Sequence, residues 1–231
     1  MSRTLNVVKM QLVNRETLVW VPLLVLGGAF VLTYAVYAIV RSAGADGPLV
    51  GGGAQAPLWY FLVVGIQSLT LTFPFSQAMS VTRREFYTGS LLAALGGSAL
   101  LAVVFVVIGL VEDATDGFGL GGVFARLPGL WDEGIPLAFA FYLVMAMLAF
   151  VTGFLAATVF KRFGTLWLVV GLLAVAAVLV LAVWLITSTG SWGSVGRWIV
   201  GQGWAGMVGW GALLVVVLAG LAYLPLRRTV P

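Results

Sequence analysis

The chain has 231 residues, of which 61% are hydrophobic and only 9% are charged, and its mean hydropathy is +1.11. The net charge of +4 does not indicate nucleic-acid binding, because the basic residues are spread over four short segments. The absence of Cys and His excludes disulfides and Ser–His or Cys–His nucleophilic pairs, and it removes the commonest zinc, haem and iron–sulfur ligands.

Six apolar stretches are each long enough to cross a bilayer, whose core of about 30 Å needs about 20 helical residues. They cover residues 18–40, 57–81, 90–111, 135–160, 164–187 and 207–226. The sequence therefore predicts a single all-α polytopic membrane domain over residues 1–231, with six transmembrane helices. The alternative, a soluble core, would need six helices that are apolar all round.

The basic residues predict the orientation of these spans. One side receives nine of the 12 Lys and Arg: Arg3, Lys9, Arg15, Arg83, Arg84, Lys161, Arg162, Arg227 and Arg228. The other side receives Arg41, Arg126 and Arg197, with the acids Asp46, Glu112, Asp113, Asp116, Asp132 and Glu133. Positive charge is retained in the cytoplasm, so both termini are predicted to be cytoplasmic in a multi-pass protein of the cell membrane.

The segment before the first span is predicted to be a helix in the membrane interface. Leu5, Val8 and Leu12 follow helical spacing, while Lys9 and Arg15 are placed to reach the lipid head groups. A basic leader that only fixes topology is the alternative. A cleaved signal peptide is disfavoured, because the apolar run 18–40 is longer than the usual signal core of roughly 7–15 residues. The glycine-rich outer loop 41–56 is expected to form no regular element.

The second span carries a polar face. Gln67, Thr70, Pro74 and Gln77 are spaced three, four and three residues apart, which places them on one side of a helix. Pro74 frees the carbonyl of Thr70 and is expected to kink the helix. Such a face lines a hydrated translocation path or a symmetry interface, or it packs against a neighbouring helix of the same chain.

A short cytoplasmic helix is predicted between the second and third spans. Its residues are Thr82, Arg83, Arg84, Glu85, Phe86, Tyr87, Thr88 and Gly89. Thr82 and Glu85 have the spacing of a capping box, which favours a helix over the alternative of a positively charged turn with interfacial aromatics. The third span then presents small residues for close helix packing: Ser90, Ala93, Ala94, Gly97, Ser98 and Ala102.

No catalytic or metal site is expected in the outer segments that follow the third span. The acids of the loop 112–134 do not have the spacing of a calcium loop, so no metal site is expected. The fifth span is almost pure hydrocarbon. The stretch 188–205 contains Trp192, Trp198 and Trp204 and is predicted to be a re-entrant or interfacial segment before the last span.

No ionisable residue lies in the middle of a span, which argues against ion-coupled transport and voltage sensing. No glycine-rich loop ends in Gly-Lys-Ser/Thr, so the chain has no nucleotide site of its own. If this protein moves a solute uphill, the energy is expected to come from another polypeptide.

Together these features resemble the permease subunit of a type-2 ABC exporter. The segment from Thr82 to Gly89 is similar to the arginine, acid, aromatic and glycine pattern of that family's coupling helix. The opening Met10-Gln11-Leu12-Val13-Asn14-Arg15 looks like that of small, six-span, actinobacterial-type permeases. The likeness covers the whole chain in architecture, but only about eight residues are distinctive.

The resemblance implies a dimer of permease chains, identical or not, working with a separate ABC ATPase that binds ATP and magnesium. Arg83 to Phe86 would dock on the ATPase, and the second and fifth spans would line the path. The apolar fifth span favours an amphipathic or lipid-like cargo, such as an antibiotic, a peptide or a lipid. The chain itself is not expected to be an enzyme. The alternatives are a non-transporting scaffold or assembly protein, and a passive facilitator or channel.

Overall fold

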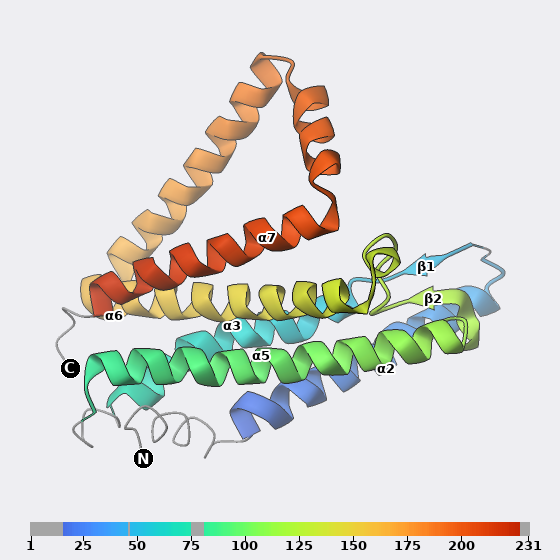
Figure 1. Ribbon diagram of the computed structural model, residues 1–231, viewed down its shortest axis with the longest axis horizontal. Coiled ribbons are helices and arrows are strands. Elements are labelled where there is room, and N and C mark those ends of the chain that lie inside the picture. Colours follow the sequence, from blue (N-terminus) through green and yellow to red (C-terminus); the bar gives the residue numbers. More distant parts are fainter. Residues whose placement is uncertain (1–15, 46, 75–80, 227–231) are drawn as a thin grey trace.

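The computed structural model describes residues 16–45, 47–74 and 81–226, which are mostly helical (Figure 1). The long helices are α2 (Val21–Ser42), α3 (Ala56–Gln67), α5 (Arg83–Ala114), α6 (Ile135–Ser188) and α7 (Trp192–Leu226). Short helical turns occupy Glu16–Trp20, Gly53–Gln55, Ser68–Thr72, Gly117–Gly121 and Trp131–Glu133. Within the described ranges, five helices are long and apolar enough to cross a membrane, which confirms the all-α membrane class.

The first part of α6 is the centre of the bundle and contacts α3, α5 and α7. Its crossing with α3 is very close, because two glycines meet there. A methyl group added to Gly153 would overlap the carbonyl oxygen of Leu62, and one added to Gly65 would overlap that of Phe150. In a membrane there is no hydrophobic driving force between helices, so they associate through close packing, and small residues allow their backbones to approach.

The small residues of α5 form its inner face, as predicted: Ser90, Ala93, Ala94, Gly97, Ser98 and Ala102 are all buried. Large rings fill the space beside them. Phe105 stacks on Tyr142 of α6 with ring centroids 4.5 Å apart, and Phe150 and Phe154 are almost fully buried. Close backbones and interlocking rings together give the bundle its van der Waals packing.

Two glycines break the C-terminal helices. Gly164 in α6 has φ +82° and Gly203 in α7 has φ +61°, a backbone region that glycine adopts without steric cost. In Figure 1 the arm of α6 after Gly164 leaves the bundle, and α7 returns to it after Gly203. The buried residues of α6 end at Thr158, so the arm 165–188 is apolar and exposed nearly throughout.

The loops after α2 and after α5 lie together at one end of the bundle, and they are more regular than the sequence predicted. The expectation that residues 41–56 form no regular element is wrong. Strand β1 (Leu49–Val50) pairs in parallel with β2 (Gly122–Val123), and Gly53–Gln55 forms a helical turn. The two loops satisfy each other's backbone groups, a pairing that composition alone does not reveal.

Apart from the junction of α6 and α7, which lies away from the bundle, the long helices start and end at the two ends of the bundle (Figure 1). The start of α5, the Gly164 turn and the end of α7 lie at one end, and the end of α2, both strands and the start of α6 lie at the other (Figure 1). The basic pairs Arg83–Arg84 and Lys161–Arg162 therefore share one end. Arg41, Arg126 and the acidic loop are at the opposite one. Which end faces the cytoplasm stays a prediction from charge.

Candidate functional site

The carboxylate of Glu112 links the end of α5 to the loop before α6, at the end of the bundle that carries strands β1 and β2. Glu112 is 2% exposed and lies near the end of α5. It accepts hydrogen bonds from the backbone N–H groups of Phe124, Ala125 (2.9 Å) and Arg126 (2.8 Å). A buried carboxylate is stable in this setting because consecutive backbone donors replace its hydration.

Helix α2 is tied to the same loop by its last turns. The hydroxyl of Tyr34 donates to Glu112 over 3.2 Å, and that of Tyr37 donates to the carbonyl of Val123 over 2.8 Å. Arg41 donates to the carbonyl of Leu120 over 2.9 Å. We call the hydrogen-bonded unit formed by Glu112, Tyr34 and residues 124–126 the outer clamp. It links α2, α5 and the loop before α6 at one end of the bundle.

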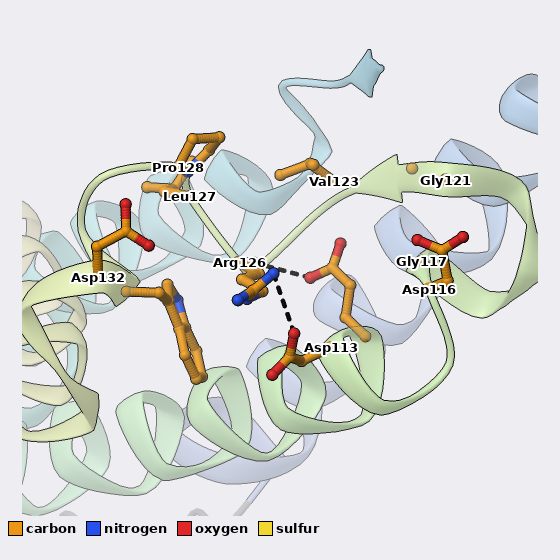
Figure 2. A pocket seen from close by; sticks show the side chains of 12 residues that line it. Asp113, Asp116, Gly117, Gly121, Val123, Arg126, Leu127, Pro128 and Asp132 are labelled. Carbon is orange, nitrogen blue, oxygen red and sulfur yellow. Dashed lines mark hydrogen bonds and ion pairs between the residues drawn. The ribbon is translucent and has the colours of Figure 1, made fainter. Parts of the chain in front are cut away.

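A polar hollow of about 270 Å³ opens beside the outer clamp (Figure 2). Arg126 points to Asp113 and forms an ion pair of 3.0 Å, with about half of each side chain exposed, so its contribution to stability is small. Among the described residues, no three His, Cys, Asp or Glu side chains are arranged to hold a metal ion together. Of the charged side chains that line the hollow, Glu112 accepts backbone hydrogen bonds, and Asp113 and Arg126 pair with each other.

Sequence reasoning missed the role of Glu112 by treating it as one of several solvated loop acids. Two signals point to it in retrospect. It follows Val111 directly, so it is the acid nearest to the apolar run of the third span. The glycine-rich segment 117–122 then allows the chain to fold back over it.

The predicted capping box at the start of α5 is confirmed. The Thr82 hydroxyl accepts from the Glu85 backbone N–H over 3.3 Å, and the Glu85 carboxylate accepts from the Thr82 backbone N–H over 3.0 Å. The prediction of a separate short helix is wrong, because α5 continues unbroken from Arg83 to Ala114. The residues of the expected coupling helix are the first turns of the third long helix.

This continuity corrects the role given to Phe86. Phe86 lies four residues before Ser90, on the small-residue face of the same helix, and its ring is 0% exposed. It packs edge-on to Phe73 with a centroid distance of 5.1 Å. The ring therefore belongs to the core of this chain and cannot also fill a pocket on a partner. Gly89 is buried as well, whereas Arg84 is exposed.

Tyr87 joins the start of α5 to the two other long helices at this end. Its hydroxyl donates to the carbonyl of Ala219 in α7 over 2.6 Å. Its ring lies 5.0 Å from that of Tyr223 in α7 and 6.0 Å from that of Phe154 in α6. Arg84, Tyr87, Thr88 and Tyr223 line an open hollow of about 330 Å³.

The polar face predicted for the second span is only partly described. Gln67 and Thr70 are half-buried and Pro74 is exposed, while Gln77 lies outside the described residues. The Thr70 hydroxyl donates to the carbonyl of Ile66 over 3.0 Å, so it is used within its own helix. A π-helical turn at Ser68–Thr72 lies directly before Pro74 and includes Thr70, whose carbonyl a proline at 74 leaves without its usual helical donor.

The predicted membrane-interface residues have different surroundings in the structure. Lys9 and Arg15 lie outside the described residues. Trp192 and Trp198 are about half exposed. Trp204 instead packs against Phe141 of α6, 5.8 Å between centroids, and its backbone N–H donates to the Glu133 carboxylate over 3.2 Å.

No protein-family model, curated protein or solved structure matches this chain. The candidate site is therefore defined by its own geometry. The outer clamp fixes one end of the bundle, and Tyr87 ties together three helices at the other. Tyr87, which makes these contacts with α6 and α7, lies within one helical turn of the exposed Arg84.

Proposed function

We propose that this protein is the membrane subunit of an ATP-driven ABC exporter, pairing as a dimer with a separate ATPase. The observation that carries the proposal is the start of α5. There a complete capping box fixes the helix end, Arg84 stays exposed, and Tyr87 connects that end to α6 and α7. An exporter needs such a connection between an ATPase surface and its transmembrane helices.

The exporter proposal includes six crossings of the bilayer. The left-handed glycine at 164 supports it, since α6 turns there and each part of α6 has the length of a span. An even number of crossings returns both termini to the cytoplasm, in agreement with the distribution of Lys and Arg.

A second copy of the permease is proposed as the other half of the path. The exposed arm 165–188 supports this, because the described parts of the chain leave almost all of its surface uncovered. A two-fold partner would supply the opposite wall. The apolar character of the arm supports an amphipathic or lipid-like cargo over a sugar or an ion.

The coupling role is tested by reversing one charge. Arg84→Glu is expected to weaken association with the ATPase at least about 30-fold, because losing a central interface anchor costs about 2 kcal/mol or more. The measurement is co-purification of the ATPase encoded with this protein, with the amount of membrane-inserted permease as reference.

Arg197→Glu is the matched control, since Arg197 is also exposed but belongs to the first part of α7, at a distance from the start of α5. It is expected to retain the ATPase. Wild-type retention by a correctly inserted Arg84→Glu protein would reject the coupling assignment and favour a scaffold or passive facilitator. Phe86→Ala does not serve this test, because it opens a cavity in the core.

Topology is tested with single cysteines in this cysteine-free chain. Cysteines at 126 and 197 are expected to react with an impermeant maleimide in intact cells. A cysteine at 84 is expected to react only after permeabilisation. Labelling of the cysteine at 84 but not of the one at 126 in intact cells would show that the protein has the reverse orientation.

A further inference from the structure

A largely apolar groove of about 440 Å³ runs between α3 and α6, a size within the range of about 300–1,000 Å³ typical of ligand pockets. It begins where the two helices separate from their contact at Gly65 and Gly153, next to Leu62 and Thr152. From there it extends towards the loop that contains Gly51 and Gly52. Along α6 it reaches from Phe141 to Thr152, about 16 Å at 1.5 Å per residue.

The inner part of the groove offers almost no hydrogen bonds to an occupant. Its walls there are Leu58, Leu62, Met145, Leu148 and Ala149. The two hydroxyls of the lining are already used: Tyr142 donates to the carbonyl of Ala125, and Thr152 donates to that of Leu148 over 2.7 Å. Water needs two to four polar partners, so it does not fill such a space.

The loop end of the groove has the opposite character. Gln55 and Trp59 are both exposed there, at the start of α3, beside the backbone of Gly51 and Gly52. A tryptophan in the first turn of a membrane helix is typical of the head-group level, where its ring is apolar and its N–H is hydrated. The groove thus changes from polar to apolar in the direction of the bilayer centre.

We propose that this groove holds one acyl chain of a membrane lipid, with the lipid head group beside Gly51 and Gln55. The polar-to-apolar gradient matches a lipid, and the groove opens to the surface between α3 and α6, where Trp59 and Thr152 are exposed. The inference goes beyond the exporter proposal, since a chain can occupy the groove without an ATPase. The close contact between Gly65 and Gly153 closes the inner end of the groove and so limits how far an acyl chain can enter.

The full-length protein is reconstituted in vesicles of phosphatidylcholine and phosphatidylglycerol that contain a little phosphatidylcholine with a diazirine in its acyl chain. After irradiation, labelled peptides are mapped by mass spectrometry. Residues 141–152 are expected to carry at least about five times the label of residues 166–180, although the latter are more exposed. Bulk lipid contact predicts the reverse order, so labelling that follows exposure would overturn the proposal.

Two variants block the groove. Ala149→Trp fills its middle, and Thr152→Phe, at an exposed position, fills its inner end if the first variant folds poorly. Either is expected to lower labelling of Met145 and Leu148 at least about fivefold. Ala177→Trp, on the exposed arm of the same helix, is the matched control and leaves labelling unchanged. Undiminished labelling in a monodisperse blocked variant also rejects the proposal.

Discussion

Replacing Gly153 by leucine is expected to force α3 and α6 apart and to lower the free energy of unfolding by about 3 kcal/mol. The clash is with the backbone carbonyl of Leu62, which cannot rotate away as a side chain would. Relief requires movement of a whole helix, so Gly65→Leu is expected to act in the same way on the facing side. Thermal unfolding of the purified protein in detergent measures the loss.

Gly171→Leu is the control for this effect. Gly171 also lies in α6, but nothing would contact a methyl group added there, because it is on the exposed arm. We expect a change of less than about 0.5 kcal/mol, as for surface sites in general. Equal destabilisation by the two variants would mean that helix α6 as a whole, and not its contact with α3, is sensitive to the larger side chain.

The second large effect is expected from Glu112→Ala, a loss of about 3 kcal/mol or more. The change leaves the N–H groups of Phe124, Ala125 and Arg126 without their acceptor, and the Tyr34 hydroxyl keeps only its 3.5 Å hydrogen bond to the carbonyl of Gly122. Each buried donor left unsatisfied costs about 1–3 kcal/mol, and hydration of the opened loop offsets part of the sum. The melting temperature and the rate of proteolysis within residues 115–134 report the change.

Asp113 provides a neighbouring acid for comparison. Its side chain is 53% exposed and its partner is the exposed Arg126, so Asp113→Ala is expected to cost about 1 kcal/mol or less. Glu112→Gln keeps one acceptor oxygen and should fall between the two. If Glu112→Ala and Asp113→Ala destabilise equally, the outer clamp is not what holds this end of the bundle.

The sequence alone predicts the features of this protein that depend on neighbours along the chain. The apolar runs locate the long helices, because a bilayer crossing requires a certain number of consecutive apolar residues. Thr82 and Glu85 form their capping box within one helical turn. The small residues from Ser90 to Ala102 repeat at helical spacing, so their positions in the chain are enough to place them on a common face.

Tertiary structure decides what these local elements contact. That Glu112 meets residues 124–126, and that Gly65 meets Gly153, depends on how loops fold back and which helices become neighbours. The burial of Phe86 was also decided by tertiary structure. A ring beside two arginines has the composition of a surface anchor, but α5 continues without a break and carries it onto the buried face. Helical period places a residue on a face, and only the packing partner determines whether that face is buried.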